Sequence, residues 1–294
     1  MASELHIEPF FHEDTGTWTY VVHRDGDAVV IDPVLDYDPA SGRIDDASVR
    51  AVTTYIVDNG LRLLRILETH AHADHLSGAQ LLRDGGEVPV GIGAGIRKVQ
   101  AHFAALFGIA ADAPVLQGAF EQLFQDGQQI PAGALTFTAC ATPGHTSDSL
   151  TYVIEDNAFV GDTLFAPDVG TARCDFPGGS IEALYASIQR LYALPDDTRL
   201  WLCHDYPPAG RERRASVSVG ESKRYNRMLD GETALDAFAT KRRERDAKLA
   251  APRLLYPALQ VNIRGGRLPR PHDNGRRYLT TPLNIEVEVP EALD

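Results

Sequence analysis

The sequence predicts a mixed α/β fold in which two β-sheets are flanked by helices. Its first third contains short runs rich in β-branched and aromatic residues, such as TWTYVVH at 17–23 and DAVVIDP at 27–33, and such runs are typical of strands. Further along, apolar runs of strand length alternate with longer amphipathic segments, as expected for sheets covered by helices. Histidine and aspartate residues follow several of these runs, so we expect a site at the strand ends.

The first part of the chain, up to residue 93, is predicted to be mainly strands. HIEPFF at 6–11 is the first strand, and RDGD at 24–27 predicts a tight hairpin turn. The segment 47–60 has helical spacing and stops at a glycine. LRLLRILET at 61–69 is a short apolar run, best interpreted as a buried strand. LSGAQLLRDGG at 76–86 then predicts a helix that opens from a histidine-rich loop.

The same alternation continues to residue 206. The expected elements are a strand at 88–93, a helix at 94–108, a hairpin at 120–130 around Asp126-Gly127, a strand that starts at 134 and runs into the Pro143-Gly144 loop, a hairpin at 150–165, a helix at 180–194 and a strand at 199–206.

The composition of the sequence changes after residue 208. The polar segment 210–250 is predicted to be helical, and the tail 256–284 to be irregular. The run KRRER at 241–245 contains Glu244 and precedes Asp246, which favours a solvated helix face over a basic binding patch. We therefore expect a core over 1–208 and a C-terminal extension over 209–294.

Composition excludes several classes of function. The formal net charge is −13, and an acidic surface repels nucleic-acid and anionic lipid phosphates. No apolar run has the length of a membrane span, and the N-terminus lacks the pattern of a secretory signal. The three cysteines form no CxxC, so a reducing compartment is favoured. We expect a cytoplasmic protein that binds neither nucleic acid nor membrane.

The clearest chemical signal is ETHAHADHLSG at 68–78. Histidine and carboxylate side chains are common ligands of zinc and iron, and further candidates follow later strands in TPGHT, VGDTL and LCHDY. The ordered set of candidate ligands is His70, His72, Asp74, His75, His145, Asp162 and His204.

The number of ions is open from these residues. Side chains alternate along an extended chain, so His70 and His72 can point together. Asp74 and His75 are adjacent and diverge from them unless the loop folds back. The loop by itself therefore suggests two ions.

The ordered set resembles the metallo-β-lactamase superfamily over residues 5–206. The resemblance implies an αββα sandwich with the metal site along one edge. In dinuclear members, one ion takes the residues that match His70, His72 and His145. The other takes those that match Asp74, His75 and His204, and the match of Asp162 bridges.

Within that superfamily the chain resembles the persulfide dioxygenases. The matching segments are TWTY at 17–20, ETHAHADH at 68–75, ARCDF at 172–176, HDY at 204–206 and VNIRGG at 261–266. The resemblance implies one Fe(II) per chain. Its ligands would be His70, His145 and Asp162, the two-histidine, one-carboxylate set of non-haem iron oxygenases.

In that case the other ligand types would support the iron ligands by hydrogen bonds; these are His72, Asp74, His75 and His204. The implied reaction converts glutathione persulfide, O₂ and water into glutathione and sulfite. Arg173, Tyr206 and Arg264 would bind the thiol, since arginine pairs well with carboxylates. The extension would contribute to this pocket, and the protein would form a homo-oligomer.

Two alternatives remain. A dinuclear zinc thiolester hydrolase of the glyoxalase II type would use all seven ligand types, and HDY, ARCDF and the C-terminal segment argue against it. A non-catalytic thiol-binding protein is the other, and an intact ligand set argues against it. The segments 163–172 and 38–48 are longer than in the family, which leaves the thiol substrate open.

Overall fold

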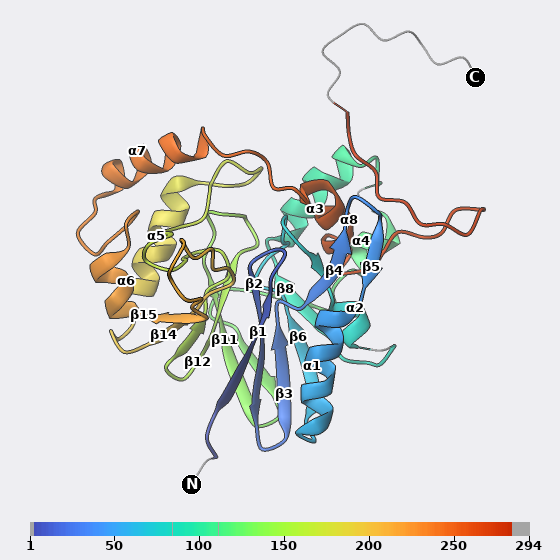
Figure 1. Ribbon diagram of the computed structural model, residues 1–294, viewed down its shortest axis with the longest axis horizontal. Helices are drawn as coiled ribbons and strands as arrows, with labels where there is room; N and C mark the ends of the chain where they lie inside the picture. The colour runs from blue at the N-terminus through green and yellow to red at the C-terminus, as the bar shows by residue number, and fades with distance from the viewer. Residues whose placement is uncertain (1–2, 84, 111, 284–294) are drawn as a thin grey trace, which may run out of the picture.

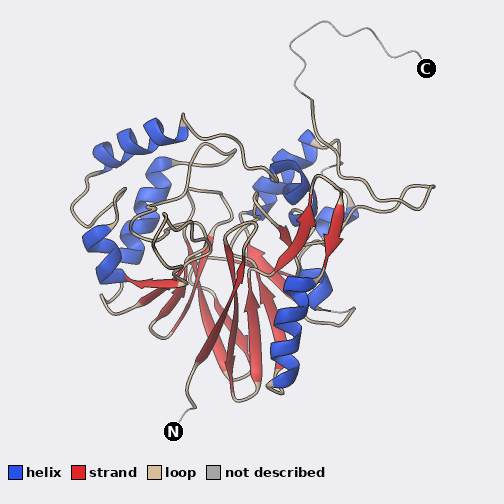
Figure 2. Cartoon of the chain, viewed as in Figure 1, coloured by secondary structure: helices blue, strands red, loops and turns tan. Residues whose placement is uncertain are grey.

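The computed structural model describes residues 3–83, 85–110 and 112–283, so the last part of the expected extension, 284–294, lies outside the described residues. Two six-stranded sheets pack face to face between two sets of helices (Figures 1 and 2). The expected αββα sandwich is confirmed. None of the helices among the described residues has the length and apolar character that crossing a bilayer requires.

The first sheet comes from the N-terminal half of the chain. Strands β1, β2 and β3 at one side of the sheet are antiparallel, and the strands from β3 to the opposite edge at β9 are parallel. In spatial order it contains β1 (His6–His12), β2 (Thr17–Arg24), β3 (Asp27–Ile31), β6 (Arg62–Leu67), β8 (Val90–Gly93) and β9 (Gln122–Phe124).

The second sheet is antiparallel except between β13 and β14. In spatial order it contains β10 (Gln129–Ala132), β11 (Leu135–Ala141), β12 (Leu150–Ile154), β13 (Asn157–Phe159), β14 (Arg199–Trp201) and β15 (Ser216–Ser218). A small third sheet has the order β5 (Arg43–Asp45), β4 (Val34–Asp38) and β7 (Leu76–Ser77).

Each outer face is closed by helices. The face of the first sheet is covered by α1 (Ala47–Asp58), α2 (Ala79–Leu82), α3 (Ile96–Leu106), α4 (Pro114–Gln117) and α8 (Leu255–Asn262). The face of the second sheet is covered by α5 (Ile181–Tyr192), α6 (Val219–Tyr225) and α7 (Leu235–Asp246). The alternating inward residues of both sheets form a separate core between them, which includes Tyr20, Ile31, Phe137 and Tyr152.

Three expectations about elements are wrong. The segment 120–130 does turn at Gly127, whose φ is 74°, but its two strands, β9 and β10, belong to different sheets. It is therefore a crossover between layers and not a hairpin. The tail is not wholly irregular, because α8 begins at Leu255 and buries Ala258 and Leu259. The helix expected at 76–86 is reduced to the short strand β7 and α2.

Candidate metal centre

The seven candidate ligands gather at one edge of the sandwich. The loop with four of them follows β6, and His145, Asp162 and His204 follow β11, β13 and β14. The four histidines His70, His72, His75 and His204 are each 1% exposed. The expectation that ligands from separate strand ends converge is confirmed.

Three of the side chains form one candidate set, His70, His145 and Asp162. One carboxylate oxygen of Asp162, Oδ2, lies 3.9 Å from His70 Nε2 and 3.6 Å from His145 Nε2. These separations are too long for good hydrogen bonds. Two atoms that each lie about 2.1 Å from a shared ion are roughly 3 to 4 Å apart, so the set has room for a metal.

The remaining four side chains form a second set, His72, Asp74, His75 and His204. In this set an ion pair is already present, because His204 Nε2 lies 3.0 Å from Asp74 Oδ2. His204 Nε2 is also 3.3 Å from Asp162 Oδ1, which places the two sets side by side. The structure therefore groups His72 with Asp74 and His75, whereas the likeness to dinuclear members implies a grouping with His70 and His145.

Hydrogen bonds fix the rings of the first set. Thr69 Oγ1 lies 3.1 Å from Nδ1 of His70, and Nδ1 of His145 donates to the Arg173 carbonyl at 2.8 Å. In each ring this leaves Nε2 to face Asp162. Metal-binding histidines have this arrangement, with one nitrogen held by the protein and the other directed to the ion.

The Asp32 carboxylate holds the histidine-rich loop after β6 in place. Its carboxylate accepts the Thr69 backbone N–H at 2.7 Å and the Thr69 hydroxyl at 2.8 Å, and it lies 3.0 Å from His72 Nε2. Asp32 adopts φ 50°, a rare conformation outside glycine, at the turn after β3. It is a turn carboxylate, and it also sets the orientation of His72.

The pKa shifts differ among the candidate histidines, including within the second set. Burial lowers the pKa of His70 well below its ordinary value, so its imidazole is neutral at neutral pH. Burial also lowers the pKa of His75 to about 4. Burial opposes the charged form of His204 too, but the Asp74 carboxylate beside it raises the pKa of His204 well above its ordinary value.

The residues fit a metal ion. Among the described residues, the buried side-chain atoms without a hydrogen-bond partner include His70 Nε2, His72 Nδ1, both ring nitrogens of His75, Asp162 Oδ1 and His204 Nε2. Buried polar atoms are rarely left without partners. Their concentration between two histidine sets indicates that a cation is the missing partner.

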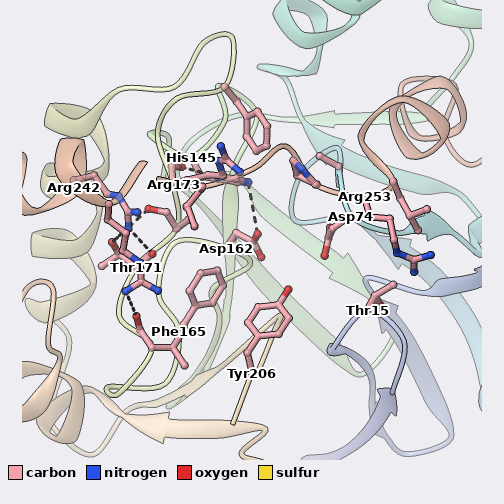
Figure 3. A pocket seen from close by; sticks show the side chains of 18 of the residues that line it. Thr15, Asp74, His145, Asp162, Phe165, Thr171, Arg173, Tyr206, Arg242 and Arg253 are labelled. Atoms are coloured by element: carbon pink, nitrogen blue, oxygen red, sulfur yellow. Dashed lines mark hydrogen bonds and ion pairs between the residues drawn. The ribbon is translucent and has the colours of Figure 1, made fainter. Parts of the chain in front are cut away.

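A pocket of about 400 Å³ opens over the centre. Figure 3 shows Asp162 and His145 in its middle, with Tyr206 and Phe165 on one side and Asp74 on another. Its wall also takes apolar side chains from the extension, among them Leu249 and Leu254. The site is therefore accessible to a small molecule with both polar and apolar parts.

Arginines surround this pocket, but two of them are already engaged. Arg173 forms two 2.6 Å hydrogen bonds with Asp175, and Arg242 is 1% exposed and pairs with Asp246. Arg245 hydrogen-bonds only the Val169 carbonyl among the described residues.

Arg253 also lines this pocket, on the side opposite Arg173 in Figure 3. Among the described residues its charge acts on the exposed Asp38, whose pKa it helps to lower after the hydrogen bonds from Ser41 and Ala40. Arg245 and Arg253 therefore leave guanidinium charge available to an anionic ligand. Sequence reasoning did not single out either residue.

The other two expected thiol contacts differ in position. Tyr206 lies in the pocket wall and its ring stacks on His204 at 5.7 Å. Arg264 is not among the residues that line this pocket. It is half-buried just after α8, and burial lowers its pKa. The thiol-binding role expected for Arg264 stays a prediction.

The interpretation of 241–245 as a solvated helix face is wrong. Lys241, Arg243 and Glu244 are exposed, but Arg242 is buried and Arg245 lines the pocket. Positions 242, 245 and 246 share one face of α7, because residues three and four apart are neighbours on a helix. The spacing of these three positions along the sequence indicates a shared helix face, which the mixture of charges in the run does not reveal.

Comparison with known proteins agrees with the fold and the candidate ligands described above. The profile of the metallo-beta-lactamase superfamily matches residues 12–204. A probable metallo-hydrolase of Burkholderia pseudomallei is 44% identical over 95% of this chain and 99% of its own length. Glyoxylase B2 of Dictyostelium discoideum is 39% identical over 96% of this chain and 97% of its own.

Persulfide dioxygenases are also similar. The mitochondrial persulfide dioxygenase of Homo sapiens is 31% identical over 68% of each chain. The crystal structure of ETHE1 from Myxococcus xanthus superposes with a TM-score of 0.71 at 28% identity, covering 89% of this chain and all of that one. With the αββα sandwich and the ordered ligands at its edge, these matches lead to one conclusion: the chain belongs to the metallo-beta-lactamase superfamily.

Proposed function

We propose that this chain is an Fe(II)-dependent persulfide dioxygenase that oxidises glutathione persulfide with O₂. The likeness to the human and Myxococcus proteins supports this reading. So do the segments ARCDF and HDY, which supply Arg173 and Tyr206 to the wall of the pocket.

The observation that carries the proposal is the difference between the two ligand sets. His70, His145 and Asp162 surround a gap that no hydrogen bond closes, and Asp162 and His145 face the pocket. In the second set, His204 is already paired with Asp74, and His72 with Asp32. One ion in the first set therefore leaves His204 and His72 paired with carboxylates, while the ring nitrogens of His75 have no hydrogen-bond partner among the described residues.

Fe(II) held by two histidines and a carboxylate supplies open coordination positions and one-electron chemistry with O₂, which zinc does not. The overall change balances as glutathione persulfide, O₂ and water giving glutathione, sulfite and two protons. The four electrons that reduce O₂ come from the outer sulfur, and the bond between the two sulfurs breaks.

The protein's own groups bind and orient the substrate. Arg245 and Arg253 dock the carboxylates of glutathione, since a guanidinium pairs with a carboxylate through two hydrogen bonds. Phe165 and Leu249 give the pocket an apolar wall that excludes water. Tyr206 is half exposed at the pocket wall, and the ordinary pKa of tyrosine is about 10. Tyr206 therefore keeps its proton and donates a hydrogen bond to the persulfide.

Oxygen consumption tests the proposal. Protein loaded with iron under anaerobic conditions is mixed with glutathione persulfide and O₂, and iron per chain, O₂ uptake and sulfite are measured. The proposal expects about one iron per chain and equal amounts of O₂ consumed and sulfite formed. Absence of O₂ uptake by protein with one iron per chain contradicts it.

A dinuclear zinc thiolester hydrolase is the second candidate. It is favoured by the second set of four ligand types and by relatives named as a metallo-hydrolase and a glyoxylase. The same protein loaded with zinc is assayed with S-lactoylglutathione. Two zinc ions per chain together with thiolester cleavage would favour this candidate over the dioxygenase.

A further inference from the structure

A single peptide group connects the candidate ligand His145 to helix α7 of the extension. Its carbonyl, that of Arg173, accepts the hydrogen bond from His145 Nδ1 at 2.8 Å. Its N–H, that of Cys174, donates to Asp246 Oδ2 at 3.1 Å. A carboxylate and a histidine therefore hold the two ends of the same peptide plane.

The carboxylate is itself held in place. Arg242, one turn earlier on α7, donates to Asp246 Oδ1 from Nε at 3.0 Å and from a terminal nitrogen at 2.6 Å. Both side chains are buried, with 1% and 8% exposed. The second terminal nitrogen of Arg242 bonds the Thr171 carbonyl at 2.9 Å. This pair therefore stays in place without access to solvent.

Two more contacts attach the same loop to the extension. Arg245 donates to the Val169 carbonyl at 3.0 Å, and Arg173 donates to the Ala250 carbonyl at 2.7 Å. The loop begins at Asp162, so both ends of it reach the metal centre. The segment 163–172 is thus joined to α7.

We infer that Asp246 is a positioning residue for the metal centre and acts on His145 through the Arg173–Cys174 peptide. Hydrogen bonds in a chain polarise one another, so a carboxylate on the N–H side makes the carbonyl a stronger acceptor for His145. The partner of a ligating histidine fixes its tautomer and ring orientation. This inference rests on the ligand role proposed above for His145, and it does not depend on iron or on persulfide chemistry.

The test uses Co(II) and the substitution Asp246→Asn, which removes the charge and keeps the shape. Two quantities are measured: the Co(II) dissociation constant by competition with a chelator, and the paramagnetically shifted N–H proton of His145 by NMR. We expect the dissociation constant to rise about tenfold, the lower end of the usual effect of such partners. We also expect the His145 N–H resonance to move.

Phe238→Leu is the matched control. Phe238 is a fully buried side chain of the same helix, and it packs on Tyr185 of α5 without a hydrogen bond to the peptide. If α7 acted only by stabilising the fold, both variants would weaken Co(II) binding in proportion to their fall in melting temperature. The inference expects only Asp246→Asn to do more than that.

A second variant keeps the inference testable if Asp246→Asn does not fold. Asp246→Asn leaves Arg242 buried without its partner, so Arg242→Met combined with Asp246→Asn removes both charges, a change that is often tolerated. Weak Co(II) binding should persist in it. Unchanged binding and an unmoved His145 resonance in a folded variant would overturn the inference. Failure of wild-type protein to bind Co(II) would instead count against the proposed metal centre.

Discussion

The side-chain amide of Asn262 donates to the backbone carbonyl of His75 at 2.8 Å, across 187 positions of sequence. The same nitrogen donates to the His72 carbonyl at 2.8 Å, and its oxygen accepts the Ser77 N–H at 2.9 Å. Helix α8 of the extension therefore shapes the loop that carries four of the seven candidate ligands.

Asn262→Ala should destabilise the protein by about 2 to 3 kcal/mol, because it leaves three buried backbone groups without partners. Urea unfolding of metal-free protein measures the change. Asn274→Ala is the control, since Asn274 is exposed and bonds only local groups, and it should change stability by less than about 0.5 kcal/mol. Equal effects of the two substitutions would show that α8 does not support the loop.

Asp162→Ala should abolish iron binding, while His75→Ala should retain most of it. Asp162 is the carboxylate of the first set. His75 belongs to the second set, where its Nδ1 lies 3.4 Å from Asp74 Oδ1, so its loss removes no ligand of the first set. Iron per chain after anaerobic loading and desalting is the measurement. Equal loss of iron in both variants would indicate a dinuclear centre.

The sequence predicted the candidate ligands of the metal centre better than the residues that hold them in place. A ligand that directly follows a strand is placed by that strand, so the position of His70 after β6 could be inferred from a run of apolar residues. Asp32 and Asn262 could not, because each acts through contacts with residues far away in sequence. Local patterns carry no information on such pairs.

The errors have similar physical causes. Asp126-Gly127 does predict a turn, but turn chemistry does not determine whether β9 and β10 join the same sheet. The run 241–245 predicts a solvated helix face because Glu244 and Asp246 accompany its basic residues. The structure instead buries Arg242 against Asp246, four residues later on the same face of α7.

Arg245→Met and Arg253→Met should each raise the KM for glutathione persulfide by about 10- to 100-fold, the value of a hydrogen bond between charged groups at about 1.5 to 3 kcal/mol. The kcat of Arg253→Met should change little, because Arg253 lies at the wall of the pocket and not among the candidate ligands. Arg245→Met also removes the hydrogen bond to the Val169 carbonyl in the loop that begins at Asp162, so its kcat should fall as well. Steady-state O₂ uptake measures both constants.

Arg224→Met controls for loss of positive charge, because Arg224 lies near the exposed Tyr225 ring and outside the pocket wall. Its KM should stay within about twofold of wild type. Cysteine persulfide, which lacks the glutamyl and glycyl carboxylates, adds a second comparison. If the pocket variants weaken both persulfides equally, the two arginines do not recognise the carboxylates of glutathione.

The stability of metal-free protein should fall as the pH rises above about 6.5, the ordinary pKa of histidine. Asp74 raises the pKa of His204 well above that value in the folded chain. A raised folded pKa gives stability that is fully present below the unfolded pKa and is lost as the pH rises through the folded one. The melting temperature of chelator-treated protein, measured from pH 6 upward, should therefore decrease.

Asp74→Asn should make this decrease smaller, because the neutral amide removes the charge that holds the proton on His204. The pairing of His72 with Asp32 remains in that variant and should leave a residual decrease. Parallel curves for wild type and Asp74→Asn would contradict the ion pair. In iron-loaded protein, persistence of the Asp74-dependent decrease would mean that His204 still carries its proton, which is the expected result if the ion occupies only the set of His70, His145 and Asp162.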